Sequence, residues 1–293
     1  MLDPIALARI GDLMQETEGR PEIGIALIDG PVDGSHPAFA RARIRTVNSS
    51  AGHGCRVTGS EACHHGTLVA GVLAADRASP APGICPGCSL LVRTIFCEAP
   101  SIASCPEVTP EELAAAVAEV VRAGARIVNM SLGLTTSALR DHAPLRRAFD
   151  DAARRGVLLV AASGNGGMIG PVPLFDHRAV VPVAACDARG RCHPSATVGR
   201  LVGRRGLLAP GVDVVSTAPG GGFARISGTS VAAPFVAGTA ALLWSLFPRA
   251  TAGQVRAALL RPGVRRASIV PPMLDAAESR AALASSFDTR GGT

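Results

Sequence analysis

Short, fully apolar runs recur along this chain of 293 residues and constrain its fold more than any other feature. A strand that is apolar along its whole length is typical of a parallel sheet covered on both faces. Segments of helical pattern separate the runs, such as Val108–Arg122 and Pro144–Arg155. This alternation predicts one α/β domain over residues 1–293, with a doubly wound, mostly parallel sheet and helices on both faces. The clearest runs are Ile23–Ile28, Val157–Ala162 and Val180–Ala185, and Ile127–Leu132 is a further expected strand that contains Asn129 and Ser131.

Shorter elements are expected near the ends of the chain and after the last long strand. Residues 1–20 are predicted to hold an amphipathic helix, Ile5–Gln15, and residues 286–293 a disordered tail. Arg200–Ala209 and Asp213–Thr217 are expected to be short strands. No repeat or linker divides the chain into two domains.

Charge and hydropathy argue against two classes of partner. The net charge is +6, but the basic residues are dispersed, so we expect no nucleic-acid partner. Val231–Phe247 is apolar but contains glycine and proline and is too short for a membrane span, so it predicts a buried helix and no membrane partner. No segment resembles a secretory signal, which predicts a cytoplasmic protein, or a secreted one if the sequence is a trimmed mature form. The sequence leaves the oligomeric state open.

The eight cysteines fall into four close pairs. An even number in local pairs predicts disulfides, although disulfides are uncommon in the cytosol. Two alternatives stay open: the cysteines are free thiols, or Cys85-Pro-Gly-Cys88 holds structural zinc with two others. The predicted pairs are Cys55 with Cys63, Cys85 with Cys88, Cys97 with Cys105, and Cys186 with Cys192.

Four polar side chains stand where predicted strands end or helices begin. Asp29 and Asn165 follow buried strands, whereas His65 and Ser230 are expected to open helices. The carboxyl edge of an open α/β sheet is where active sites form. An acid, a base and a serine in this order match one of the known chain orders of a catalytic triad. The alternative interpretations are a turn-starting aspartate and a helix-capping serine.

The segments around these residues resemble motifs of the subtilisin-like serine proteases. Ile28–Pro37 resembles the aspartate motif, His65–Gly71 the histidine motif and Gly228–Pro234 the serine motif. The resemblance extends from about residue 20 to about residue 275. It implies a subtilisin-like fold and serine endopeptidase activity.

The same resemblance implies a catalytic role for each of the four side chains. Ser230 is the expected nucleophile, His65 its general base, and Asp29 the carboxylate that orients His65. The Asn165 amide and the Ser230 backbone N–H are expected to bind the oxyanion. His64, which precedes His65, is not the expected base.

The resemblance also implies where the substrate binds. The backbone of Ser131, Leu132 and Gly133 is expected to pair with an extended peptide. Small residues are expected to line the pocket for the residue before the cut, namely Ala161, Ser163 and Gly164.

The chain departs from the family pattern at several points. Asp76–Gly83 replaces the family's Asn-rich calcium loop and offers too few oxygens, so we expect no metal and no cofactor. Gly166 stands where an acidic residue often follows the oxyanion asparagine, so no preference for a basic residue is implied. Asp33 and His36 belong to the aspartate motif and are expected to be structural.

The segment Asp-Gly-Pro-Val-Asp-x-x-His-Pro, with cysteines nearby, is similar to subtilases that mature cyanobactin-type (patellamide) peptides. This implies a peptide or protein substrate, with a ribosomal precursor peptide as the candidate, and removal of its leader. Only 35 residues separate Asp29 from His65, too few for the helical insertion of macrocyclising members. A macrocyclising transpeptidase and a catalytically idle, peptide-binding pseudoprotease are the alternatives.

Overall fold

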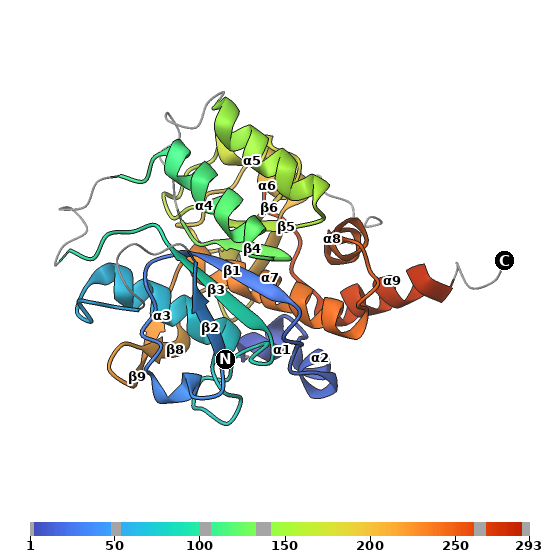
Figure 1. Ribbon diagram of the computed structural model, residues 1–293. Helices are drawn as coiled ribbons and strands as arrows, with labels where there is room; N and C mark the ends of the chain where they lie inside the picture. Colours follow the sequence, from blue (N-terminus) through green and yellow to red (C-terminus); the bar gives the residue numbers. More distant parts are fainter. Residues whose placement is uncertain (1–2, 48–53, 100–106, 133–141, 261–267, 289–293) are drawn as a thin grey trace.

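The computed structural model describes residues 3–47, 54–99, 107–132, 142–260 and 268–288 (Figure 1). Seven strands form one sheet in the order β2-β3-β1-β4-β5-β6-β7, and all neighbours are parallel, which confirms the predicted sheet. The strands are β1 (Gly24–Asp29), β2 (Arg43–Thr46), β3 (Ser89–Thr94), β4 (Ile127–Met130), β5 (Leu158–Ala162), β6 (Val180–Cys186) and β7 (Leu207–Pro210). An antiparallel hairpin, β8 (Val214–Ala218) and β9 (Gly222–Ile226), lies apart from this sheet.

Helices cover both faces of the sheet (Figure 1). β1 serves both faces, since Ile25 and Leu27 join one core whereas Ala26 and Ile28 join the other. On the first face lie α1 (Pro4–Leu7), α2 (Gly11–Glu16), α3 (Glu61–Ala74), α7 (Thr229–Leu246), α8 (Ala252–Leu260) and α9 (Ala276–Asp288). On the second lie α4 (Pro110–Arg122), α5 (Ala143–Arg154) and α6 (Arg200–Arg205). The described residues also contain two 3₁₀ turns, Pro37–Phe39 and Pro173–Asp176.

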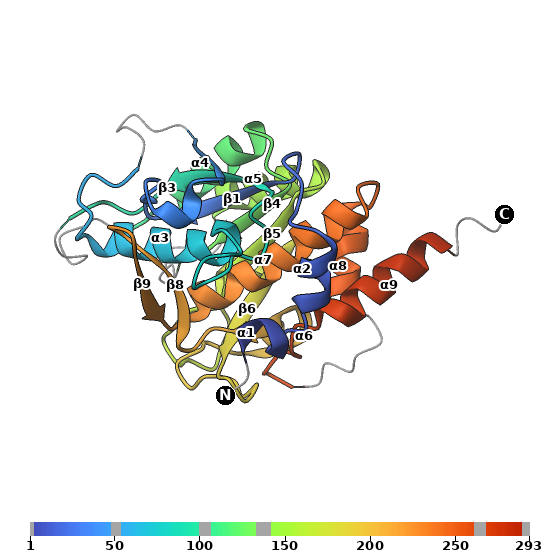
Figure 2. The same cartoon turned by 90° about the horizontal axis from the view of Figure 1, so that it is seen from below.

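Helix α7 runs through the middle of the first layer, beside α3 (Figure 2). All of its residues from Thr229 to Ser245 are buried. Within the described part of the chain, it is the one helix long and apolar enough to cross a membrane, yet 94% of that stretch is buried inside the protein. This is the burial of a core helix, as the apolar run in the sequence predicts.

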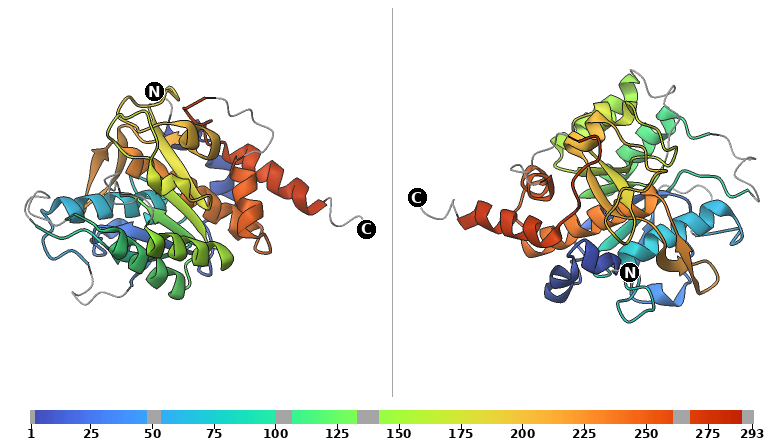
Figure 3. Two further views of the ribbon diagram at one scale, coloured as in Figure 1. Left: turned by 90° about the horizontal axis from the view of Figure 1, so that it is seen from above. Right: turned by 180° about the vertical axis from the view of Figure 1, so that it is seen from behind.

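Three expectations about local structure are wrong. The single helix at Ile5–Gln15 is two short helices, because Arg9 has φ +52°, a left-handed backbone that an α-helix does not contain. Arg200–Arg205 forms α6, and only Leu207–Pro210 of that segment is a strand. The last helix, α9, continues to Asp288 and extends away from the body of the protein (Figure 3), so residues 286–288 are not a disordered tail.

Two glycines let α3 lie directly against the loop that follows β1. A Cβ atom at Gly66 would lie 2.4 Å from the carbonyl oxygen of Pro31 and 2.5 Å from that of Gly30. A Cβ atom at Gly30 would lie 2.0 Å from the carbonyl oxygen of Ala62. Because these neighbours are backbone atoms, no side chain can move aside to make room.

We therefore expect Gly66→Ala to lower the free energy of unfolding by about 1–3 kcal/mol, because α3 and the loop must separate to admit the methyl group. Urea denaturation measures this change. The matched control is Gly59→Ala just before α3, where a Cβ atom meets nothing within 4 Å and the expected change is below about 0.5 kcal/mol. Equal stability of the two variants would show that the close approach is not required.

Candidate active site

The carboxyl ends of three neighbouring strands meet at one edge of the sheet. Asp29 is the last residue of β1, Ser131 follows β4, and Ser163 follows β5. Within the sheet, β2 and β3 lie on one side of β1, and β4, which follows them in the chain, lies on the other side of β1. In open α/β sheets, the crevice at such a switch point is the usual binding site.

A buried carboxylate at this edge is hydrogen-bonded to a histidine. Asp29 has no exposed surface, and its Oδ1 lies 2.6 Å from Nδ1 of His65 and 2.6 Å from the amide of Gly30, which donates to it. The other carboxylate oxygen of Asp29 is buried and has no partner within the described residues. A carboxylate only accepts hydrogen bonds, so Nδ1 carries the proton and Nε2 of a neutral His65 keeps its lone pair.

His65 lies in the second turn of α3 and does not open the helix, contrary to the sequence expectation. The helix begins at Glu61, and Ser60 caps it by accepting a hydrogen bond from the amide of Cys63 at 3.1 Å. His64 is exposed, and the bond to Asp29 is made by His65, as predicted.

The charge of Asp29 controls the protonation of His65. Burial of the imidazole disfavours its charged form, but the Asp29 charge and hydrogen bond favour it more, so the pKa of His65 lies above its usual value. The His65 side chain is still 28% exposed. It is therefore accessible to exchange a proton with a bound substrate.

Ser230 is the second residue of α7, and Gly228 precedes the helix with φ +152°. A Cβ atom at Gly228 would lie 3.3 Å from Oγ of Ser230 and 3.1 Å from Nδ2 of Asn165, so both polar groups flank this glycine. The Ser230 amide lies in the first helical turn, where N–H groups lack helical partners and the helix dipole is positive. No hydrogen bond among the described residues joins Ser230 Oγ to His65; such bonds are often long until substrate binds.

The side chain of Asn165 is held in one orientation by Thr229. Its Oδ1 accepts hydrogen bonds from the Thr229 amide at 2.9 Å and from the Thr229 hydroxyl at 3.0 Å. The same hydroxyl accepts a bond from the amide of Gly164 at 3.1 Å. Because the oxygen is fixed by two donors, the Nδ2 group takes the other position of the amide, beside Gly228, and no hydrogen bond from it to a described residue is seen. Sequence reasoning missed this role of Thr229, although a hydroxyl between Gly228 and the serine was visible.

A second chain of hydrogen bonds ties β4 to the start of α7. Nδ2 of the Asn129 side chain donates to Oγ of Ser131 at 2.7 Å, and this hydroxyl donates to the carbonyl of Ser230 at 2.9 Å. Both side chains are buried. The sequence predicted only backbone contacts for Ser131 and gave no sign of its contact with Ser230.

The predicted substrate-binding residues differ in how exposed they are. Ala161 has no exposed surface, Ser163 is 3% exposed, and Gly164 is partly buried with φ +101°. The Ser163 hydroxyl is buried and has no hydrogen-bond partner within the described residues. Leu132 is 2% exposed, whereas Gly133 lies outside the described residues. Substrate contacts of these five residues and of Ser131 stay predictions.

Asp33 and His36 are structural, as expected, because both attach the β8–β9 hairpin to the loop after β1. Oδ2 of Asp33 accepts a hydrogen bond from the amide of Gly220 at 2.9 Å, and Nε2 of His36 lies 2.8 Å from the carbonyl oxygen of Gly222. The ring of His36 also packs edge-on against Phe223.

One predicted disulfide is present beside His65. Cys55 and Cys63 are joined, and this bond links the loop before α3 to its first turn. Cys97 is also disulfide-bonded, but Cys105 lies outside the described residues, so that pairing stays a prediction. The remaining four are thiols here, contrary to the predicted pairing: Cys85, Cys88, Cys186 and Cys192.

Three possible metal ligands also gather at this disulfide. Ligand atoms of Cys55, Cys63 and Glu98 lie within 4.8 Å of one another. The two sulfurs are joined to each other, and Glu98 already accepts hydrogen bonds from the amides of Arg56 and Val57. The carboxylate of Glu98 alone is too small a ligand set to hold a cation.

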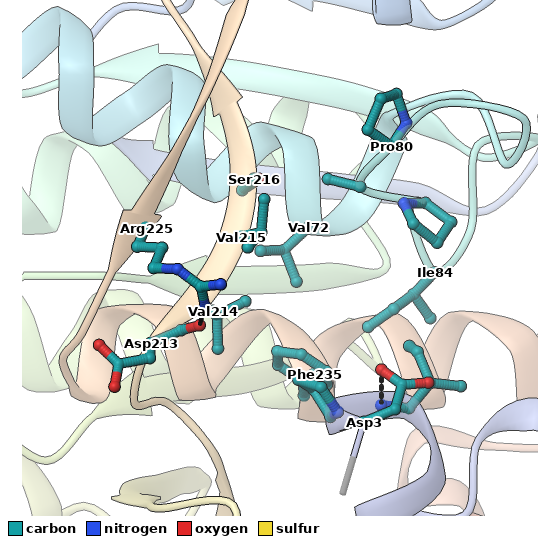
Figure 4. Close-up of a pocket in the computed structure, with 14 residues that line it drawn as sticks. Asp3, Val72, Pro80, Ile84, Asp213, Val214, Val215, Ser216, Arg225 and Phe235 are labelled. Carbon is teal, nitrogen blue, oxygen red and sulfur yellow. Dashed lines mark hydrogen bonds between the residues drawn. The ribbon is translucent and has the colours of Figure 1, made fainter. Parts of the chain in front are cut away.

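A cavity of about 260 Å³ lies between α1, α3, β8 and α7 (Figure 4). Its wall is largely apolar and includes Val72, Ile84 and Phe235, with Asp213 and Arg225 on the side of the hairpin. The Arg225 guanidinium donates to the backbone carbonyl of Asp213 at 3.1 Å. None of the four predicted catalytic side chains lines this cavity, so it is separate from the candidate active site.

The contacts of His65 predict how its titration depends on Asp29. We expect Asp29→Asn to move the pKa of His65 from above to below about 6.5, because burial then acts without the opposing charge. An NMR titration of the imidazole measures it. In the native chain, the stabilisation from charged His65 is fully present below about pH 6.5 and is lost as the pH rises through the raised pKa. A raised pKa in the variant would contradict this account.

Known proteins resemble this chain in sequence and in fold. Residues 21–267 match the subtilase family. Subtilisin DY from Bacillus licheniformis is 33% identical over 197 residues, which are 66% of this chain and 67% of that protein. The chain spans about half to two thirds of the length of several curated relatives that it matches.

Two solved structures resemble the chain over almost its whole length. The protease domain of PatA is 33% identical, with a TM-score of 0.82 over 92% of this chain and 97% of that one. The prenylagaramide maturation protease PagA is 31% identical, with a TM-score of 0.82 over 94% of this chain and 98% of that one. The chain belongs to the subtilase family of serine peptidases.

Proposed function

We propose that this chain is a processing endopeptidase that removes the leader from a precursor peptide through an acyl-enzyme intermediate. One observation carries the proposal: the buried Asp29–His65 pair lies at the same sheet edge as Ser230 and an Asn165 amide whose oxygen is already occupied. A nucleophile, a base and an oxyanion donor are the three parts that acyl transfer requires.

The first half of the reaction forms the acyl-enzyme. Ser230 Oγ attacks the carbonyl carbon of the scissile bond, and Nε2 of His65 takes the hydroxyl proton. Asp29 stabilises the imidazolium that results, through the 2.6 Å contact with Nδ1. His65 then gives the proton to the leaving amine, and the peptide bond breaks.

The negative charge that develops on the substrate oxygen needs donors that are already in place. Nδ2 of Asn165 and the amide of Ser230 supply them, because Thr229 fixes the Asn165 side chain and the start of α7 presents its own N–H groups. Water replaces the amine in the second half, and the same groups act in reverse to release the acid. Oriented donors need no rearrangement as charge develops.

The substrate class is proposed from the relatives and from the loop beside the site. PagA is a maturation protease by name, and PatA shares its fold with this chain at a similar identity. Between Asp29 and α3, the described residues form a 3₁₀ turn and β2, and only residues 48–53 are not described. The described residues in this interval form no α-helix, and the macrocyclising members that the family resemblance brings in carry a helical insertion here, so hydrolysis is favoured over macrocyclisation.

The test of this proposal pairs a serine-reactive fluorophosphonate probe with product masses. We expect the native chain to be labelled and Ser230→Ala to lose both labelling and turnover, with kcat reduced about 10⁶-fold. Hydrolysis of a precursor peptide yields fragments whose summed mass exceeds the substrate by one water. A product of unchanged mass would identify a macrocyclising transpeptidase. A folded native chain without labelling would identify an idle, peptide-binding pseudoprotease.

The contacts of Asn165 predict a large loss of kcat when its amide is removed and a smaller loss when only its orientation by Thr229 is weakened. Asn165→Ala should lower kcat about 10²–10³-fold and leave KM within about twofold, because the amide acts mainly on the transition state. Thr229→Val keeps the shape of the side chain but removes the hydroxyl that orients Asn165, and should lower kcat about fivefold. Thr229→Ser retains the hydroxyl and should keep native kcat. Steady-state kinetics on one peptide compares all three, and equal loss in both Thr229 variants would contradict the positioning role.

A further inference from the structure

The hairpin that follows β6 places two cysteines directly opposite one another. Cys186 and Cys192 form an antiparallel bridge. On one side of the pair, the amide of Asp187 donates to the carbonyl of Arg191 at 3.0 Å. On the other side, the amide of His193 donates to the carbonyl of Ala185 at 2.8 Å. The cysteines are therefore a non-hydrogen-bonded pair, in which side chains approach most closely and Cα atoms lie ~4.5 Å apart, within the ~4.4–6.8 Å that a disulfide spans.

The two sulfurs differ in their access to solvent. Cys186 is 1% exposed and its Sγ contacts Sδ of Met273 at 3.7 Å, whereas Cys192 is only partly buried. Both side chains pack against the core on the α4–α5 face. Burial raises the pKa of both thiols, and together with Asp187 and Cys192 it raises that of Cys186 to about 12. Because Cys192 is the more exposed sulfur, it is the one that an external oxidant meets first, and Cys186 is the one that resolves the product.

The segment that follows this hairpin holds the loop of Asn165. We call residues 195–198 the brace segment. The amide of Thr197 donates to the carbonyl of Gly164 at 2.8 Å, and the amide of Gly167 donates to the carbonyl of Ser195 at 2.7 Å. These bonds lie on both sides of Asn165. The position of the brace segment therefore sets the position of the oxyanion donor.

We propose that Cys186 and Cys192 are a reversible dithiol–disulfide site whose oxidation fixes the brace segment, and with it the Asn165 loop. The oxidant is a small-molecule disulfide such as oxidised glutathione. The Cys192 thiolate attacks it and releases one glutathione thiol. Cys186 then loses its proton, attacks Sγ of Cys192 and releases the second, so two protein thiols become one disulfide and one oxidant becomes two thiols.

The other thiol pair lacks such an entry path. Cys85 and Cys88 are buried, and a Cβ atom at Gly19 would lie 2.5 Å from Sγ of Cys88, so the N-terminal segment covers this sulfur. These two cysteines serve as the internal comparison for accessibility. Under the same oxidant they should stay reduced.

Peptide mapping tests the disulfide independently of any activity. The full chain is incubated with oxidised glutathione, alkylated and cut with trypsin, which cleaves after Arg189 and Arg191 inside the hairpin. Peptides 179–189 and 192–200 should then run as one species that separates on reduction. Separate alkylated peptides, or glutathione retained on Cys192, would overturn the proposal.

The link to the Asn165 loop is tested by comparing oxidised native chain with oxidised Cys192→Ser, in which the bond beside His65 is retained. Hydrogen exchange of the peptide that contains Gly167 should be about threefold slower in the native chain. Equal exchange would overturn the link. The kinetic arm rests on the proposed function: kcat of the native chain should be about threefold higher at a similar KM. If both the native chain and Cys192→Ser were inactive, the proposed peptidase function would be contradicted. The peptide map and the hydrogen exchange would still decide whether Cys186 and Cys192 form the redox site.

Discussion

The hydrogen bond between Asp29 and His65 can form only if several segments of the structure are held close together. A carboxylate with no exposed surface is costly to bury unless donors surround it, and here the donors are Nδ1 of His65 and the amide of Gly30. This requires α3 to approach the end of β1 closely enough that backbone atoms of the two segments touch. The glycines at Gly30 and Gly66 make that approach possible, because a methyl group at either position would overlap a carbonyl oxygen.

The neighbouring segments then hold α3 and α7 in place around this contact. The hydroxyl of Thr217 on β8 donates to the carbonyl of Thr67 at 2.8 Å, and that of Ser216 donates to the carbonyl of Leu68 at 2.7 Å. Ser131 performs the same task for α7 by donating to the carbonyl of Ser230. Base and nucleophile thus sit on two helices that are each fixed to strands by buried hydroxyl groups. Geometry held in this way costs little reorganisation during reaction.

The oxyanion donor depends on a different set of contacts. Asn165 lies in a loop, and its orientation comes from Thr229 at the start of α7, while its backbone is held by the brace segment that leads from the β6 hairpin. The donor is therefore coupled to the nucleophile on one side and to the Cys186–Cys192 hairpin on the other. A disulfide at the hairpin would act on the donor and leave the Asp29–His65 pair unchanged.

The sequence alone determined the parallel sheet, because runs such as Ile23–Ile28 are apolar along their whole length and only a doubly covered strand needs that pattern. It also singled out Asp29, His65, Asn165 and Ser230 as the candidate site, because each lies in a segment that resembles a subtilase motif. It missed β2 and β9, which are short and mostly exposed and so lack an apolar signal. Only the tertiary structure decided the roles of Thr229 and Ser131 and which cysteines bond. These contacts depend on atoms from distant segments of the chain, and the distances between such atoms cannot be inferred from the local sequence pattern.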